Sequence, residues 1–486
     1  MAEASAAADL ASVVQVSCGS SHTVALLDCN VVASWGRGED GQLGHGDAEQ
    51  VDAPRAVHAL LGADVSAVCC GAEYTVAVSK QHRRVYSWGW GDFGRLGHGD
   101  CTDVFVPRLV DFFNGMAVKQ VACGDTHTLV CTDAGELYTF GRNQNGQLGH
   151  GNTNDLLSPQ RVAGLQGKVV TSVAGGAEHS VIATDKGEVY AWGWGRYGNL
   201  GDGDRQDRHA PAAVNSASID SSSAGSVTSV ACGWRHSAAV TSDGRVFTFG
   251  WSKYGQLGLG DHEDRLVPAE VSGLAGRHVV AIAGGWRHTM ALDSEGGVWA
   301  WGWNKFGQLG IGSTEDQASP VAVSSLAGSP IAQLACGWRH TVAVGRAGQV
   351  FSWGRGVNGQ LGHGLERDEA RPRTLAALCR GAVNVAGLVA SARPQGGYVA
   401  PADRYAVVPS GEDCGGNAGV PEDLPDSAVP EMIEVPGVPD SSSTGLLGNG
   451  SGLAGECFSG EGGPPAKRQH VAAPAGSADD AAVPGS

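Results

Sequence analysis

The segment WGWNKFGQLG, residues 301–310, decides the fold, because its pattern of an aromatic residue, Gly, four variable residues and Gly-x-Leu-Gly recurs along the chain. The seven copies follow one another at steps of 53, 52, 52, 57, 52 and 52 residues and begin at Trp35, Trp88, Phe140, Trp192, Phe249, Trp301 and Trp353. The longer step contains the Ser-rich residues 215–226, and a surface loop absorbs such an insertion at little cost. A fixed period of this length indicates a repeat fold with seven units.

Each unit has the composition of short β-strands. In the third unit the run Thr128–Cys131 is followed by the turn Thr132–Gly135 and by a second run ending at Phe140. Short apolar or β-branched runs bounded by Gly and Asp are typical of hairpins. The sequence therefore predicts an all-β protein, a seven-bladed β-propeller over residues 11–395, whose closed ring leaves few sheet edges exposed. Residues 372–391 look like the start of a further unit and are expected to supply the strand that completes the first blade.

Composition limits the remaining parts of the chain. Residues 1–10 form a short N-terminal extension that carries Glu3 and Asp9 and lacks the apolar segment of a signal peptide. Residues 396–486, rich in Gly, Ser, Pro and acidic residues, are expected to be a flexible acidic tail. No apolar run approaches the roughly 20 residues of a membrane span. The net charge of −17 argues against direct DNA binding.

The twelve cysteines lack a compact disulfide framework, and several fall at one repeat position. We interpret them as small buried residues of a protein in a reducing compartment. The Cys-x-x-x-His spacing in these units could indicate a metal site, but no further ligands converge in sequence. We therefore predict neither metal nor cofactor, and interpret these histidines as a repeat consensus that bonds the backbone. A second set, His45, His98, His150 and His363, also recurs at one position and is expected to be structural.

A second motif, Gly-Trp-Arg-His, occurs three times with a step of 52 residues, with its indoles at Trp234, Trp286 and Trp338. Equivalent positions of neighbouring repeats lie side by side on one face, so three indoles and three guanidinium groups are expected to form a cluster. The tryptophans that open the WGWNKFGQLG-type motif are instead expected to be blade core.

The residues at the Trp-Arg position divide the ring by charge. Units two to four place Glu73, Asp125 and Glu178 there, whereas units five to seven place Trp-Arg pairs. A two-fold axis brings such a face against itself in the opposite sense, so acidic and basic halves meet twice. The pattern predicts a homodimer held by Arg–carboxylate pairs. The alternative is a solvated face whose ion pairs each contribute only about 0–1 kcal/mol.

Both motifs resemble those of the regulator-of-chromosome-condensation repeat family over roughly residues 10–395. The three Gly-Trp-Arg-His units, the run Trp88–Gly97 and the run Arg404–Pro409 are similar to the plant and algal UV-B photoreceptors within that family. The resemblance implies dimer contacts of Arg287 with Asp92 and Asp103, of Arg339 with Glu39 and Asp40, and of Arg142 with Glu178. It also implies secondary contributions from Arg235, Arg196 and Lys305.

The resemblance further implies a light-sensing function without a bound chromophore. Indole is the standard side chain that absorbs in the UV-B, and the expected sensing set is Trp234, Trp286 and Trp338, with Trp90 contributed across the dimer interface. Excitation would disturb or neutralise the neighbouring arginine, with electron transfer to the guanidinium as one route, and the dimer would dissociate. Phe140 stands where these receptors usually have Trp, which is expected to alter energy transfer but not sensing.

The resemblance also implies the partners. The monomer would bind the WD-repeat domain of an E3 ubiquitin ligase through Val408-Pro409, with WD-repeat repressors as further partners, and would signal to transcription. The protein would be cytoplasmic and nuclear, with nuclear enrichment after UV-B.

Three other functions remain open from the sequence. A guanine-nucleotide exchange factor for a small nuclear GTPase, as in the founding family member, would be expected to carry a basic N-terminal arm. A light-independent ubiquitin-ligase adaptor would depend wholly on its tail. An enzyme would need a nucleophile–base pair, a phosphate loop or a metal-ligand cluster, and we find none of these motifs in the sequence.

Overall fold

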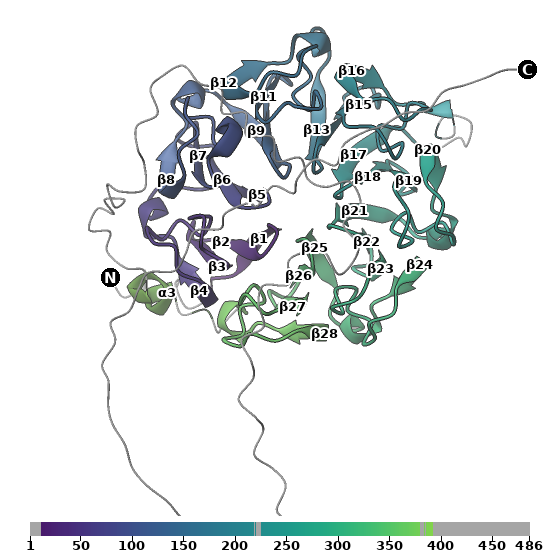
Figure 1. Ribbon diagram of the computed structural model, residues 1–486. Coiled ribbons are helices and arrows are strands. Elements are labelled where there is room, and N and C mark those ends of the chain that lie inside the picture. Colours follow the sequence, from purple (N-terminus) through teal and green to yellow (C-terminus); the bar gives the residue numbers. More distant parts are fainter. Residues whose placement is uncertain (1–10, 218, 220–224, 380–382, 384, 392–486) are drawn as a thin grey trace, which may run out of the picture. The chain divides into compact units, whose positions relative to one another are not determined.

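The computed structural model describes residues 11–217, 219, 225–379, 383 and 385–391. They form seven four-stranded antiparallel sheets arranged as the blades of a propeller (Figure 1). This confirms the predicted all-β, seven-bladed architecture. No helix among the described residues is both long and apolar enough to cross a membrane.

Each blade takes four consecutive strands, so blade 1 contains the first four and blade 7 the last four. The strands are β1 (Val13–Cys18), β2 (His22–Leu27), β3 (Val32–Gly36), β4 (Val51–Ala56), β5 (Ala67–Cys70), β6 (Tyr74–Ser79), β7 (Arg84–Gly89), β8 (Val104–Leu109), β9 (Val118–Cys123), β10 (His127–Thr132), β11 (Leu137–Gly141), β12 (Leu156–Arg161), β13 (Val170–Gly175), β14 (His179–Thr184), β15 (Val189–Gly193), β16 (Arg208–Ala213), β17 (Val227–Cys232), β18 (His236–Thr241), β19 (Val246–Gly250), β20 (Arg265–Glu270), β21 (Val279–Gly284), β22 (His288–Asp293), β23 (Val298–Gly302), β24 (Gln317–Ala322), β25 (Ile331–Cys336), β26 (His340–Gly345), β27 (Val350–Gly354) and β28 (Glu369–Thr374).

Short helical elements connect the blades. Single-turn 3-10 helices follow the fourth strand in six blades, a further one lies in blade 2, and one α-helix follows blade 7. They are η1 (His58–Leu60), η2 (Asp92–Gly94), η3 (Asp111–Phe113), η4 (Ala163–Leu165), η5 (Ser272–Leu274), η6 (Ser324–Leu326), η7 (Ala376–Leu378) and α3 (Val385–Ser391).

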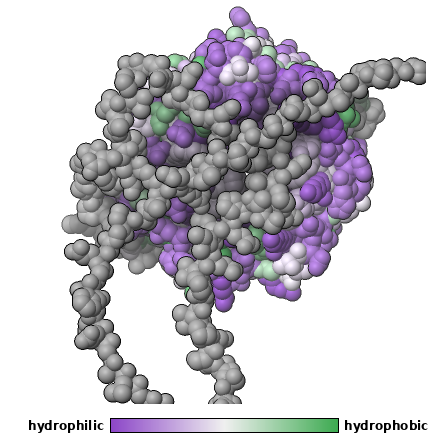
Figure 2. All heavy atoms as spheres, viewed as in Figure 1, coloured by the Kyte–Doolittle hydropathy of each residue, from purple (hydrophilic) through white to green (hydrophobic). Residues whose placement is uncertain are grey.

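The first strand of every blade lines a central cavity of about 390 Å3. The second strand is buried along its whole length in all seven blades, because sheets pack against both of its faces. The fourth strand is the most exposed, and the part of the rim visible over β12, β16 and β20 is mainly hydrophilic (Figure 2). The repeat thus orders each blade from a small-residue cavity wall, through an apolar layer, to a polar rim.

In the five units whose motif opens with Trp, the indole joins the blade to the one before it. The indole N–H of Trp88 donates to the backbone oxygen of Gln42 at 2.9 Å, and Trp35 makes the same bond to Gln360 across the ring closure. The last glycine of the motif lies against this indole: at Gly44, where φ is +73°, an added Cβ would be 2.8 Å from Nε1 of Trp88. The opening tryptophans are completely buried, which confirms that they are blade core.

The histidines that begin the second strands also join neighbouring blades. His236 Nε2 lies 2.9 Å from Oγ1 of Thr289 in the next blade, and His22, His127, His179, His288 and His340 make equivalent contacts. The expectation that these histidines bond the backbone was wrong in this respect, since their partner is a hydroxyl. The second set is structural as expected: His45 Nε2, for example, lies 3.0 Å from Oγ of Ser34 in its own blade.

The predicted completion of blade 1 by residues 372–391 is wrong. Strand β28 pairs with β27 of its own blade, and blade 1 is built wholly from residues 13–56. The ring closes instead through backbone bonds such as that from Gly364 N–H to the Asp52 oxygen at 2.9 Å, and through side-chain contacts such as that of His340 Nε2 with Thr23 Oγ1 at 2.9 Å. Helix α3 packs near β4, and its Leu388 joins the hydrophobic core that blades 1 and 7 share. A shared strand is unnecessary because the inter-blade bonds continue unbroken from blade 7 to blade 1.

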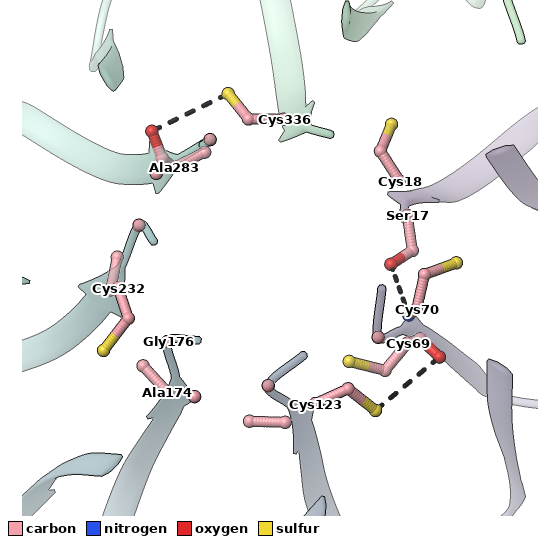
Figure 3. A pocket seen from close by; sticks show the side chains of 18 of the residues that line it. Ser17, Cys18, Cys69, Cys70, Cys123, Ala174, Gly176, Cys232, Ala283 and Cys336 are labelled. Carbon is pink, nitrogen blue, oxygen red and sulfur yellow. Dashed lines mark hydrogen bonds between the residues drawn. The ribbon is translucent and has the colours of Figure 1, made fainter. Parts of the chain in front are cut away.

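The repeat cysteines differ in part from the expectation of small buried residues. Cys70 is buried, whereas Cys18, Cys123, Cys232 and Cys336 are half-buried and line the cavity (Figure 3). All the cysteines that the structure describes are free thiols. Within the same part of the chain, no three His, Cys, Asp or Glu side chains are grouped so that they could hold a metal ion.

Candidate functional site

The Trp-Arg pairs lie between the first and second strands of blades 5, 6 and 7, where each inner strand ends at the cavity. The ring centroids of Trp234 and Trp286 are 5.4 Å apart, at 61° between planes. Trp286 and Trp338 are stacked, with centroids 5.7 Å apart and planes at 17°. The repeat register therefore brings together the three indoles that the sequence predicts, at the separations typical of contacting aromatic rings.

A second layer of aromatic side chains extends this cluster. It comes from the loop after the third strand, and centroid distances of 5.2–6.0 Å join its rings to one another and to Trp234 and Trp286. Its members are Trp194, Tyr197, Trp251, Tyr254, Trp303 and Phe306. The result is one network of nine rings across blades 4 to 7.

Arg287 occupies the centre of this network. Its Cζ lies 3.8 Å from the centroid of Trp286, and 4.9, 5.3, 5.5 and 5.7 Å from those of Tyr254, Trp303, Trp251 and Trp234. One guanidinium N–H donates to the hydroxyl of Tyr254 at 2.8 Å, and only 3% of the residue is exposed. A desolvated cation over an indole face gains up to about 2 kcal/mol, so the rings hold this charge in place.

The flanking arginines have similar environments. Arg235 Cζ lies 3.9 Å from the ring of Trp234 and 4.5 Å from that of Trp194. Arg339 Cζ lies 4.8 Å from the ring of Trp286. Burial, followed by the positive charges of Arg355 and Arg287, lowers the pKa of Arg339 to about 10. Several positive charges are thus concentrated beside the indoles.

Half-buried carboxyl groups occupy the equivalent positions in blades 2 to 4. Burial raises the pKa of Glu73 to about 7, although Arg37 lies 3.3 Å away and Gln42 donates to its carboxylate at 2.6 Å. Burial, assisted by the negative charge of Glu178, also raises the pKa of Asp125 to about 7, while a hydrogen bond from the Trp338 side chain opposes the shift. Burial raises the pKa of Glu178 as well, against Arg142 and Arg235.

The other predicted acidic residues have partners within the chain. Glu39 and Asp40 lie 2.7 and 3.8 Å from Arg37. Asp103 accepts a hydrogen bond from the backbone of Gly91 at 2.8 Å, and burial raises its pKa. Asp92 is exposed in η2. Within one chain Glu39 and Asp40 thus pair with Arg37, and their contacts with Arg339, like those of Asp92 and Asp103 with Arg287, stay predictions about a dimer.

Of the remaining predicted site residues, Lys305 lies beside the network, with its Nζ 5.9 Å from the ring centroid of Phe306. Trp90 is on blade 2, where the Cζ of Arg95 lies 3.8 Å from its ring. Arg142 Cζ lies 4.6 Å from the ring of Phe93 and its guanidinium donates to Gln144. Arg196 and Lys305 are exposed. Val408 and Pro409 lie outside the described residues.

The sequence analysis missed several residues of this face. Arg95 is completely buried at the place where the other units have Gln or Asn, and burial lowers its pKa to about 10. The aromatic residues Tyr197, Tyr254 and Phe306 share the sixth motif position with Phe93 of unit two, whereas the other three units have Asp or Asn there. Comparison of each motif position across the seven units gives the signal that identifies both sets.

A seven-bladed ring of such repeats, with indoles and guanidinium groups at one end of its cavity, is a propeller of the regulator-of-chromosome-condensation type. The model of the RCC1-like domain matches residues 5–226 and 217–392. The chain belongs to this family.

Within the family the chain is UVR8-like. It is 49% identical over 421 residues to the Ultraviolet-B receptor UVR8 of Arabidopsis thaliana, a match that covers 84% of this chain and 94% of the receptor. It is 37% identical over 312 residues to the human E3 ubiquitin-protein ligase HERC2, but spans only 6% of that protein. The first match is thus to nearly the whole of a receptor, whereas the second is to a small part of a much larger ligase.

Solved structures show the same fold. Human WBSCR16 superposes with a TM-score of 0.63 at 28% identity, over 71% of this chain and 93% of that one. Yeast RCC1 (Prp20), solved with Kap60, gives a TM-score of 0.62 at 23% identity, over 71% of this chain and 83% of that one. At this identity the second likeness concerns the fold alone.

Proposed function

We propose that this protein is a UV-B photoreceptor that uses its own tryptophans as the chromophore. The observation that carries the proposal is Arg287, enclosed by five aromatic rings in direct contact with Trp286. Indoles in contact can share excitation energy, and a guanidinium at their centre is placed to respond to it. The 49% identity to an Ultraviolet-B receptor supports the same function.

In the dark the protein is a homodimer in which the basic face of blades 5–7 meets the acidic face of blades 1–4 of the second copy. In this contact Arg287 pairs with Asp92 and Asp103, and Arg339 with Glu39 and Asp40. A further pair, between Arg142 of blade 3 and Glu178 of blade 4, lies outside the basic face. Arg235, Arg196 and Lys305 add to the contact, and Trp90 approaches the indole cluster of the partner. The separation of charge between the two sides of one ring supports this arrangement.

Excitation of Trp286, coupled to Trp234 and Trp338, disturbs or neutralises the adjacent guanidinium groups. Removing one member of a buried ion pair costs about 3–5 kcal/mol, because the other charge is left uncompensated. An interface that depends on a few such pairs then dissociates. The freed monomer binds the WD-repeat domain of an E3 ubiquitin ligase through Val408-Pro409, and WD-repeat repressors are further partners. The monomer accumulates in the nucleus from a cytoplasmic pool.

Size-exclusion chromatography of the full-length protein with and without UV-B tests this function. We expect a dark dimer that becomes a monomer on irradiation, and a Trp286→Phe variant that stays dimeric. The matched control is Trp299→Phe: Trp299 is half-buried outside the network, with its ring over Arg277 and its indole N–H donating to Asp293.

The outcomes separate the alternatives. A Trp286→Phe variant that dissociates as the wild type does would remove the sensing role of this cluster. A monomer in both conditions would contradict the dimer and favour an exchange factor or a light-independent adaptor. A dimer that ignores UV-B would remove the photochemical proposal.

A further inference from the structure

The cavity wall contains a regular contact between neighbouring blades. The thiol of a repeat cysteine donates to a backbone oxygen of the preceding blade, at the residue just before the end of that blade's inner strand. Cys18 contacts Ala335 in this way at 3.8 Å, and Cys336 contacts Ala283 at 3.7 Å. In both contacts the residue that accepts the hydrogen bond is an alanine, whose side chain is a methyl group.

At the junction of blades 2 and 3 the same geometry places two thiols together. Cys123 Sγ donates to the backbone oxygen of Cys69 at 3.9 Å, so the residue at the alanine position is here a cysteine. Both side chains line the central cavity and are half-buried, and Figure 3 shows them facing each other. The adjacent Cys70 is placed differently: it is buried, and its backbone N–H donates to Oγ of Ser17.

The two thiols of the pair have different surroundings. A hydrogen bond from the Cys123 thiol lowers the pKa of Cys69. Burial, followed by interaction with Cys69, raises the pKa of Cys123. The thiolate is the nucleophilic form of cysteine, so Cys69 is the residue that reacts first and Cys123 the one that resolves.

We propose that Cys69 and Cys123 form a redox-active pair at the cavity wall, which hydrogen peroxide oxidises to a disulfide that joins blades 2 and 3. The Cys69 thiolate attacks one peroxide oxygen, the O–O bond breaks, and hydroxide leaves with the electron pair. Sγ of Cys123 then attacks the sulfenic sulfur of Cys69, forms the S–S bond and releases water as the thiol proton transfers. In sum, two thiols and one peroxide give one disulfide and two waters.

The cavity gives a peroxide access to the pair. Its volume of about 390 Å3 is many times the roughly 30 Å3 that a water molecule occupies in the liquid. One half of the disulfide, Cys123, lies two residues before Asp125, whose carboxyl accepts a hydrogen bond from the Trp338 side chain. Oxidation would therefore act directly beside the indole cluster, independently of the proposed response to light.

The test treats the dilute full-length protein with hydrogen peroxide, blocks the remaining thiols with N-ethylmaleimide and identifies cross-linked peptides by mass spectrometry without reduction. We expect an intramolecular link between the peptide containing Cys69-Cys70 and the one containing Cys123, with dithiothreitol reversing it. Cys69→Ala and Cys123→Ala are expected to lose the link. The matched control, Cys70→Ala, is expected to keep it, and so is Cys336→Ala.

The wild-type measurement stands without the variants, so a variant that fails to fold leaves the proposal falsifiable. A wild-type protein that shows no such link, or only sulfinic acid at Cys69, would overturn the proposal. A link that survives in Cys69→Ala but disappears in Cys70→Ala would also overturn it, because the wrong thiol would be reacting.

Discussion

Glu73 shows how one residue can combine structural and electrostatic roles. Its carboxyl accepts hydrogen bonds from Ser20 and Gln42 and lies 3.3 Å from Arg37, yet burial keeps its pKa near 7. The desolvation of the charged form therefore outweighs the favourable contacts. Protonation of this group changes within the physiological range of pH.

We expect the Glu73→Gln variant to depend less on pH than the wild type. Because the folded pKa of about 7 lies above the usual glutamate value of 4.5, the folded state retains a proton that the unfolded state has lost between these values. Stability conferred by this group is full below about pH 4.5 and falls as the pH rises to 7, by an amount on the order of 3 kcal/mol. The variant lacks this loss of stability. The free energies of unfolding measured by urea denaturation at pH 5 and pH 8 show the difference.

The exposed Glu263 provides the control for this measurement. A Glu263→Gln variant is expected to follow the wild-type pH dependence. If Glu73→Gln also follows it, the raised pKa of Glu73 is wrong.

The sequence predicts the positions of the functional residues better than their partners. Equal spacing in the repeat places Trp234, Trp286 and Trp338 together, because equivalent residues of adjacent blades must be neighbours. The ion pair of Arg37 with Glu39 depends instead on a turn geometry that spacing alone does not determine. The burial of Arg95 was missed because a cation at a glutamine position is recognised only when all seven units are aligned.

At the level of elements, the His–hydroxyl contacts replace a shared strand as the connection between blades. The side chains of His340 and Thr23 are both buried, so water cannot replace either of them as a hydrogen-bond partner if the other is removed. A buried polar group left without a partner costs about 1–3 kcal/mol. Ring closure therefore depends on a bond of the same kind as the one between any two blades.

We expect the His340→Ala variant to lower the free energy of unfolding by about 1–3 kcal/mol, since it leaves Thr23 with one bond fewer and opens a small cavity. Urea denaturation of the full-length protein measures this change. His58→Ala, at an exposed position of η1, is expected to stay within about 0.5 kcal/mol of the wild type. Equal stabilities of the two variants would show that the closing bond contributes nothing.

The strands were predictable as elements, whereas their assignment at the ring closure was not. Residues 372–391 resembled a new unit because they contain the Pro and the short turn that occur near the end of every unit. In the structure these features belong to β28 and η7 of blade 7, and α3 follows. Periodicity reveals the length of a unit, but it does not reveal where in the period one sheet ends and the next begins.

For the whole molecule, the decisive question is how charge is distributed around the ring. In one chain Glu39 and Asp40 are paired with Arg37, so dimer formation must exchange or share these partners. The sequence predicts the two charged sides, but the pairing across a two-fold axis requires the second copy. For that reason the dimer contacts remain proposals.

We expect the dissociation constant of the dark dimer to rise with salt, because the Debye length falls from about 10 Å at 0.1 M to about 3 Å at 1 M. Analytical ultracentrifugation across this range, without irradiation, measures the effect. An Arg277→Gln variant, altered at an exposed arginine outside the proposed interface, should show the same slope as the wild type. A dimer whose affinity is unchanged by salt would contradict an interface held by ion pairs.

Every blade is one uninterrupted segment of chain, and this has an evolutionary consequence. Duplication or loss of a coding segment of about 52 codons adds or removes a complete sheet, because no strand is borrowed from elsewhere in the gene. A duplicated segment also carries the residues that contact the blade before it and the blade after it. Three consecutive Gly-Trp-Arg-His units are the pattern that successive copying of one ancestral segment produces, so a light-absorbing cluster can arise from a single indole by gene duplication alone.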